Sequence, residues 1–325
     1  MDPELHSAPR RSALAVLQSS LVCGAVLLLM VACVLAWQGY LAWAGALAIA
    51  VCAGHAAVLA LECGCAAWVQ RRGTAPAIPA LIWCRVWWHE VKLAPKVFAW
   101  RQAFRWRALP DNTEPVPGDG PSAVMVHGFV CNRGFWLPWF SAMRERDWVY
   151  TSVNLEPVFG AIEAYVPIIE EAVARAERLG TARPTLICHS MGGLAARAWL
   201  VSGGGQHERV ARVITIGSPH RGTWIGRFSR MDNGRQMRED CDWLCQLAAL
   251  ETAQRGEAPY AQFVCWEADT DNVVFPSATA RLPGADNRLV SGVAHVELAF
   301  HPRVMGESLG MLASAGSSPS LRTES

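Results

Sequence analysis

The chain has 325 residues, a net charge of +1 and 52% apolar residues. A charge so close to balance excludes a nucleic-acid binder that relies on bulk positive charge. Eleven cysteines without paired spacing exclude a disulfide scaffold. Cys241 and Cys245, one helical turn apart, lack the two further ligands that zinc would need, so we expect neither a metal nor a cofactor.

Residues 1–72 are predicted to form a transmembrane helical hairpin. Residues 12–70 contain one charged residue, Glu62. The two apolar runs, about 13–37 and about 41–69, are each long enough for a helix to cross a hydrocarbon core of about 30 Å. A cleaved signal peptide is the alternative, but the first run is long for one and a second follows at once. His55 and Glu62 share a helix face, which suits either polar contact with the partner helix or an intramembrane function.

Charges at the ends of these runs predict orientation. Arg10 and Arg11 precede the first run, Arg71 and Arg72 follow the second, and the connecting turn at 38–40 has no charge. Because Lys and Arg residues that flank membrane spans are enriched on the cytoplasmic side, we expect both chain ends and the soluble domain on the cytoplasmic side of an inner membrane. Unpaired cysteines suit that reducing compartment.

Tryptophans and cations interleave in residues 73–110, around Pro95, which should break or kink a helix. Directly after a membrane hairpin, this composition favours a juxtamembrane segment in the lipid headgroup layer. Packing against the soluble domain and single-strand nucleic-acid binding are the alternatives. We expect membrane lipid as the partner and no nucleic acid.

Residues 111–314 are predicted to form one α/β domain, followed by a disordered tail at 315–325. Strand and helix patterns alternate, which predicts about six mainly parallel strands with helices on both faces. The expected strands are 123–126, 149–155, 185–188, 210–216, 262–266 and 288–291.

The strand at 185–188 runs into His-Ser-Met-Gly-Gly and then a helix, which places Ser190 on a sharp corner. A serine there is exposed beside backbone N–H groups, as a nucleophile requires. The segment resembles the G-x-S-x-G nucleophile elbow of the α/β-hydrolase superfamily, in the H-S-M-G-G form of bacterial lipases and esterases, with Cys188 in place of the first glycine.

That resemblance extends to other segments and covers roughly residues 121–312. His127-Gly128 ends the first soluble strand, and the resemblance assigns the oxyanion hole to the backbone N–H groups of Phe129 and Met191. The Gly-Ser-Pro-His segment at 217–220 is typically structural in these hydrolases. The following residues, about 223–258, fit a cap insertion. The fold is expected in a short form that lacks the two leading strands.

The resemblance also implies the remaining triad members. The D-x-V-V-x-P pattern favours Asp271 as the acid, with Asp269 as the alternative. The base must follow the acid in the chain, and His295, in a Gly-x-x-His segment, is favoured over His301.

We therefore expect a membrane-anchored serine esterase or lipase that acts on acyl esters of lipidic substrates through an acyl-enzyme. An acyltransferase or thioesterase with the same triad, and a catalytically silent protein with a hydrolase-like domain, are the alternatives. Acyl chain, alcohol and oligomeric state are left open by the sequence.

Overall fold

A computed structural model describes residues 12–73, 76–115, 120–180 and 183–316. Its core is a six-stranded sheet in the order β2-β1-β3-β4-β5-β6, with every neighbouring pair parallel. The strands are β1 (Ser122–Val126), β2 (Val149–Ser152), β3 (Thr185–His189), β4 (Arg212–Ile216), β5 (Phe263–Ala268) and β6 (Asp286–Val290). The expected six-stranded parallel sheet is confirmed, with strand boundaries shifted by a few residues.

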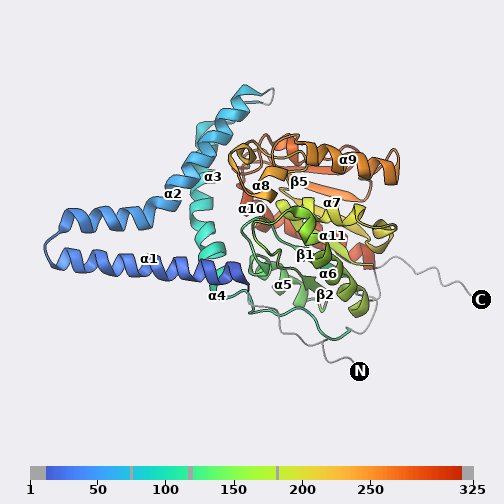
Figure 1. Cartoon of the computed structure of the whole chain (residues 1–325), viewed down its shortest axis with the longest axis horizontal. Helices are drawn as coiled ribbons and strands as arrows, with labels where there is room; N and C mark the ends of the chain where they lie inside the picture. Colours follow the sequence, from blue (N-terminus) through green and yellow to red (C-terminus); the bar gives the residue numbers. More distant parts are fainter. Residues whose placement is uncertain (1–11, 74–75, 116–119, 181–182, 317–325) are drawn as a thin grey trace, which may run out of the picture.

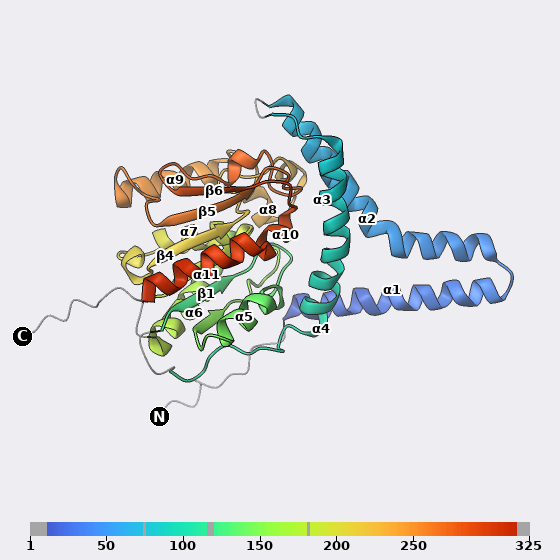
Figure 2. The same ribbon diagram turned by 180° about the vertical axis from the view of Figure 1, so that it is seen from behind.

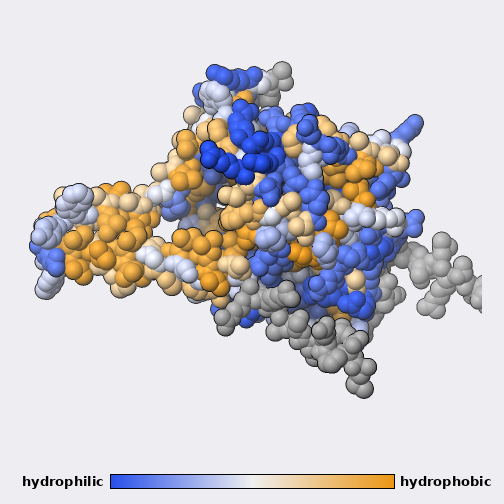
Figure 3. Space-filling model, viewed as in Figure 1, coloured by the Kyte–Doolittle hydropathy of each residue, from blue (hydrophilic) through white to orange (hydrophobic). Residues whose placement is uncertain are grey.

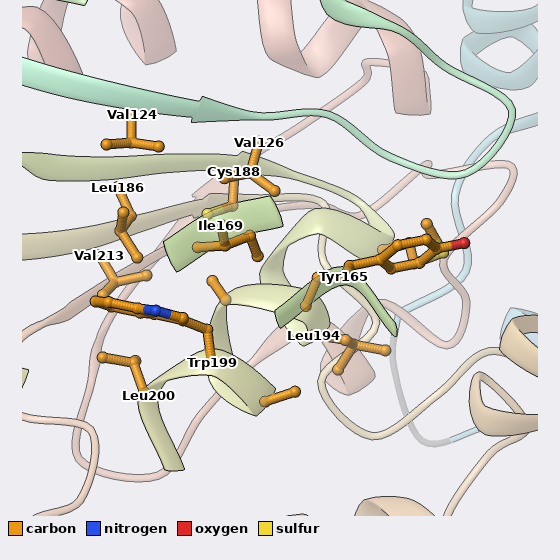
Figure 4. Close-up of a cluster of buried hydrophobic side chains, with 14 of the residues drawn as sticks. Val124, Val126, Tyr165, Ile169, Leu186, Cys188, Leu194, Trp199, Leu200 and Val213 are labelled. Carbon is orange, nitrogen blue, oxygen red and sulfur yellow. The ribbon is translucent and has the colours of Figure 1, made fainter. Parts of the chain in front are cut away.

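Helices cover both faces of the sheet (Figure 1). They are α5 (Leu137–Arg144), α6 (Val166–Leu179), α7 (Met191–Val201), α8 (Asp232–Gln236), α9 (Asp242–Arg255), α10 (His295–Phe300) and α11 (Pro302–Gly316). Strand side chains alternate between the faces, so Val124 packs with α6 and α7 while Met125 packs with α5, α10 and α11. Figure 4 shows the first of these clusters, in which Trp199 of α7 lies against Leu186 and Val213.

Two long apolar helices precede this domain, as expected. α1 (Ala13–Trp37) is capped by the Ser12 side chain, and α2 (Leu41–Arg72) follows after a short turn. Both are long and apolar enough to cross a membrane. α1 and the first part of α2 lie side by side as an arm that projects from the domain (Figures 1 and 2). Figure 3 shows the arm as a hydrophobic surface with a more hydrophilic tip.

The remainder of α2 changes direction and runs along the domain beside α3 (Ala80–Ala94), between the arm and the domain (Figure 2). At Pro95 the α-helix gives way to a π-helical segment, Pro95–Arg101, followed by α4 (Gln102–Phe104). We call the second part of α2, residues 55–72, together with α3 the interfacial layer. Its tryptophans differ in burial, because Trp83 is buried against Phe275 whereas Trp88 is exposed. Trp100, in the π-helical segment beyond α3, is also exposed.

The interfacial layer corrects one expectation. His55 Nε2 lies 3.3 Å from the carbonyl oxygen of Val91 in α3, and Glu62 bonds to Asn272 of the domain. Neither contact is to α1, the partner helix of the expected hairpin. The polar residues of α2 therefore fasten it to the domain side rather than to the other apolar helix.

The expected cap at 223–258 is corrected in part. Leu244 and Leu247 of α9 are buried, and Glu251 forms a buried ion pair with Arg197 of α7. α9 thus belongs to the helical layer of the domain, because its apolar face has the core to pack against. The part nearer the site is η6 (Trp224–Phe228) and α8. Arg10 and Arg11 and most of the expected tail lie outside the described residues, and α11 continues to Gly316.

Candidate active site

Ser190 occupies the corner between β3 and α7. Its backbone has φ 53° and ψ −128°, a conformation that non-glycine residues rarely adopt and that tends to occur at functional sites. The corner is held because the Ser190 N–H donates to the carbonyl of Ile216 on the neighbouring strand, at 2.9 Å. The strained turn lies at the carboxyl edge of the sheet, where functional side chains from several strands can meet.

Asp271 and His295 meet at this same edge. Asp271 follows β5, His295 follows β6 at the start of α10, and Oδ2 of Asp271 lies 2.8 Å from Nδ1 of His295. Oδ1 of Asp271 accepts the N–H groups of Val273 and Val274, at 2.8 and 2.7 Å. A carboxylate held in this way orients the imidazole and places its ring proton on Nδ1, which leaves the Nε2 lone pair available as a base.

The His295 pKa reflects two opposing influences. Burial lowers it, the charge and hydrogen bond of Asp271 raise it, and Glu90 and Glu62 raise it further, with a net increase above the ordinary 6.5. Protonation of His295 is therefore stabilised by its surroundings. This property suits a group that must accept a proton during a reaction.

Two glycines allow the backbone to come close to these side chains. A Cβ on Gly217, where φ is +57°, would lie 3.2 Å from Nδ1 of His295 and 3.3 Å from Oδ2 of Asp271. A Cβ on Gly128 would lie 2.8 Å from the Cβ of Ser190. The loop after β1 and the loop after β4 therefore both contact the expected triad, and a side chain at either position would displace it.

The expected oxyanion residues lie beside Ser190. Met191 is the first residue of α7 and follows Ser190 directly, and Phe129 follows Gly128, the residue in close contact with Ser190. Val130, next in the loop, has φ 53°. Positive φ at Ser190 and at Val130, in two loops that lie in contact, is consistent with N–H groups that are fixed in advance of substrate binding.

Other histidines near the edge have structural partners. His127 is buried, with Nδ1 donating to the carbonyl of Gly128 at 3.0 Å and Nε2 accepting the N–H of Leu155 at 3.1 Å. Burial lowers the pKa of His127 to about 4. Nε2 of His220 lies 3.0 Å from Oγ1 of Thr215, and burial lowers its pKa.

His189 lies between Phe135 and His295. Its ring stacks on Phe135 at 4.4 Å between centroids and lies 4.7 Å from the ring of His295. Burial holds the pKa of His189 well below its usual range, so the ring is neutral. The residue before Ser190 thereby packs against His295, which places β3 and the start of α10 in direct contact.

The alternative candidates are placed differently. Asp269 accepts the N–H of Gly292 at 2.9 Å through Oδ1 and so joins the turns after β5 and β6. His301 lies at the far end of α10, about 9 Å along the helix axis from His295. The geometry therefore pairs Asp271 with His295.

Three residues around His295 were not singled out as site residues from the sequence. Asn272 accepts the His295 N–H at 3.1 Å, and Glu62 accepts from the Asn272 side chain at 2.8 Å. Glu90 of α3 accepts the N–H of Val296 at 3.2 Å. A signal was present, because Glu62 and Glu90 are the two acidic residues in the stretch 12–110.

Within the described residues, no group of three or more His, Cys, Asp or Glu side chains is placed to hold a metal ion. All eleven cysteines are free thiols.

The parallel sheet, its strand order and the strained strand-to-helix serine define an α/β-hydrolase fold. The chain has that fold, and the family model of the PGAP1-like alpha/beta domain matches residues 160–229, which include β3, Ser190 and α7.

Two solved structures show the same fold. The mature form of lipase BlEst2 of Bacillus licheniformis is 15% identical with a TM-score of 0.50, and the match covers 62% of this chain and 95% of the lipase. Lipase B of Aspergillus fumigatus is 14% identical with a TM-score of 0.51, over 64% of this chain and 56% of the lipase. This chain thus spans little more than half the length of the fungal lipase. No curated protein matches the sequence.

Proposed function

We propose that this protein is a membrane-anchored serine hydrolase that cleaves carboxylic esters of lipidic substrates. The observation that carries the proposal is the 2.8 Å contact between Asp271 and His295 at the sheet edge where Ser190 occupies a strained corner. An aspartate, a histidine and a serine in these roles activate the hydroxyl, which alone is a poor nucleophile at neutral pH.

In the proposed reaction, Nε2 of His295 takes the Ser190 hydroxyl proton as Oγ bonds to the ester carbonyl carbon. The carbonyl electron pair moves to oxygen, where the N–H groups of Phe129 and Met191 stabilise the charge. The pair then returns, the C–O bond to the alcohol breaks, and His295 gives its proton to the leaving oxygen. Water repeats the sequence on the acyl-enzyme, which releases the acid and restores Ser190.

The arrangement around the arm supports a lipidic substrate. An apolar hollow of about 450 Å³ lies between α2 and η6, and its lining residues are Ala60, Leu61, Gly64, Cys65, Trp68 and Trp224. The guanidinium of Arg72 lies 3.9 Å from the Trp68 ring centroid and that of Arg227 lies 4.5 Å from the Trp224 centroid. Apolar surface flanked by cations suits an acyl chain with an anionic headgroup.

The hollow is separate from the Ser190 corner but linked to it. The Trp224 ring stacks on Phe275, with ring centroids 5.8 Å apart, and the backbone N–H of Trp224 donates to the backbone carbonyl of Phe275 at 2.9 Å. Phe275 ends the segment that begins at Asp271. A lipid that enters from the bilayer beside α2 would therefore meet the loop that carries the acid.

Two measurements test the proposal with the full-length protein in phospholipid vesicles. A fluorophosphonate probe should label Ser190, and esters of graded chain length should be hydrolysed faster when presented in vesicles than in solution. A protein that neither labels nor hydrolyses esters would be the catalytically silent alternative. Transfer of the acyl group to an added alcohol or thiol in preference to water would indicate an acyltransferase.

A further inference from the structure

The stretch from residue 12 to residue 110 contains two acidic residues, Glu62 and Glu90. Glu62 is linked to the His295 segment through Asn272, and Glu90 bonds directly to Val296 of that segment. Eight Lys and Arg residues lie in the same stretch, between 71 and 110. The hydrogen bonds of Glu62 and Glu90 nevertheless run to the catalytic domain. Because a carboxylate in an apolar setting is costly to desolvate, two that converge on one segment call for a specific reason.

Glu62 reaches His295 through Asn272. Oε2 of Glu62 accepts from Nδ2 of Asn272 at 2.8 Å, and Oδ1 of the same amide accepts the backbone N–H of His295 at 3.1 Å. Asn272 is 1% exposed. Since both ends of its amide are bonded, its side chain cannot rotate without loss of a hydrogen bond, and the backbone of His295 is held relative to α2.

Glu90 reaches the next residue directly. Oε1 of Glu90 accepts the N–H of Val296 at 3.2 Å, in the first turn of α10, where backbone N–H groups lack intrahelical partners. Glu90 is 2% exposed, and its Oε2 has no hydrogen-bond partner among the described residues. Burial raises the pKa of Glu90 to about 7. A buried carboxyl with one unpaired oxygen stabilises the packing of a helix poorly, because apolar side chains would hold α3 against the domain without the desolvation cost of a carboxyl group.

We propose that Glu62 and Glu90 are positioning residues for His295, so that the interfacial layer completes the active site. The inference rests on the proposed hydrolase function. It means that the helices outside the hydrolase domain hold the base from two sides, through Asn272 and through Val296. Displacement of the layer, as on removal from the bilayer, would then lower activity even with Ser190, Asp271 and His295 intact.

Charge gives this arrangement a measurable signature. The titratable groups that face His295 from the packed elements are Asp271 after β5, His189 on β3, Glu90 on α3 and Glu62 on α2. On its own helix, Glu297 is paired with His89 at 2.9 Å. The ionised forms of Glu62 and Glu90 favour the imidazolium, so replacement of either carboxylate should move the acid limb of kcat/KM to lower pH. For Glu90, whose pKa is about 7, the effect is confined to the pH range in which it is ionised.

The test uses the full chain in bilayer nanodiscs. Glu62→Ala and Glu90→Ala remove the hydrogen-bond acceptor, whereas Glu62→Gln and Glu90→Gln keep an acceptor and remove only the charge. Matched controls are Gln70→Ala, which removes the 3.3 Å bond from α2 to the Asp269 carbonyl, and Trp87→Phe, which removes the 2.8 Å bond from α3 to the Ala56 carbonyl. Each control removes one hydrogen bond of the layer and leaves the bonds of Glu62 to Asn272 and of Glu90 to Val296 in place.

We expect the alanine variants to lose about 10²-fold in kcat with little change in KM, because a displacement of about 1 Å at the base has this effect. The glutamine variants should recover much of kcat, with the acid limb displaced to lower pH, and fluorophosphonate labelling should slow in parallel with kcat. The two controls should keep wild-type kcat and the wild-type pH profile.

Wild-type kcat in folded alanine variants would overturn the inference, and so would an equal loss in the Gln70 and Trp87 controls. Should an alanine variant fail to fold, the corresponding glutamine variant decides, since an acid limb identical to that of the wild type would show that this carboxylate has no influence on His295 and would contradict the inference. Wild-type protein that neither labels nor hydrolyses esters would overturn the proposed function itself and the inference with it.

Discussion

Oδ2 of Asp271 lies 2.8 Å from Nδ1 of His295, although the two residues follow different strands and are 24 positions apart in the chain. The other carboxylate oxygen is occupied by two backbone N–H groups, from Val273 and Val274. The carboxylate therefore has one orientation, and the imidazole that it holds presents Nε2. Five predictions follow from this pair, the fold around it and the arm.

Replacement of the nucleophile or the base should abolish esterase activity. We expect Ser190→Ala and His295→Ala each to lower kcat by at least about 10³-fold with the fold intact, because members of such a triad act as a unit. Ser202→Ala, at the other end of α7, and His301→Ala are matched controls that should stay near wild type. Assays with p-nitrophenyl esters, with circular dichroism as the folding check, measure this. Substantial activity in either triad variant would reject the assignment.

The two candidate acids should separate in a direct comparison. Asp271→Asn should lower kcat by about 10⁴-fold, since an amide cannot hold the same imidazole tautomer. Asp269→Asn keeps an oxygen that can accept the Gly292 N–H, so its kcat should stay within a few-fold of wild type. An inverted ranking of the two variants would transfer the role of the acid to Asp269.

Activity should rise with pH through a midpoint above 6.5. Burial lowers the His295 pKa, but Asp271, with Glu90 and Glu62, raises it beyond the ordinary 6.5. The neutral imidazole is the active form, so kcat/KM increases as pH passes the raised pKa. The free energy of unfolding should change with pH in the opposite direction to activity. The stabilisation that the protonated His295 ring contributes is complete below pH about 6.5 and is lost as pH rises through the raised pKa of His295. A midpoint below 6.5 in the kcat/KM profile would contradict this prediction.

The buried ion pair between α7 and α9 should matter for stability. Arg197 and Glu251 are 1% and 2% exposed and form two hydrogen bonds, at 2.8 and 2.7 Å, while Arg197 also donates to the His220 carbonyl at 2.9 Å. Glu251→Gln leaves the guanidinium charge uncompensated, which should cost about 3–5 kcal/mol of unfolding free energy. The double variant Arg197→Met with Glu251→Leu should lose less. Urea unfolding of the wild type, Glu251→Gln and the double variant measures these differences in unfolding free energy. A Glu251→Gln protein as stable as wild type would show that the ion pair contributes little to stability.

The arm should place the domain on the cytoplasmic side. Arg71 and Arg72 are the last two residues of α2 and Arg85 lies in α3, whereas the turn between α1 and α2 carries no charge. A fluorescent protein fused after residue 325 should therefore fluoresce, and alkaline phosphatase fused there should be inactive, because it matures only outside. A fusion into the turn at 38–40 is the matched control and should behave in the reverse manner. Active phosphatase at the C-terminal end would invert the topology.

Local patterns in the sequence determined most of the fold. Short continuous apolar runs predict the buried strands, since neighbouring side chains such as Val124 and Met125 face different helical layers and both are buried. The long apolar runs predict α1 and α2 for a similar reason, because their length and the absence of charge are local properties. Ser190, Asp271 and His295 could be nominated because each lies in a short motif at the end of a strand.

Only the tertiary structure decided which groups meet. Asp269 and Asp271 are nearly equivalent as sequence, and the turn after β5 directs Asp271 to His295 while Asp269 turns to Gly292. In the sequence, Glu62 is an isolated charge in an apolar segment and Glu90 an isolated acid in a basic one. No local pattern indicates that these residues contact Asn272 and Val296, which lie more than 200 positions later in the chain. Such contacts depend on strand order and helix docking, which bring together side chains whose separation along the chain carries no periodic signal.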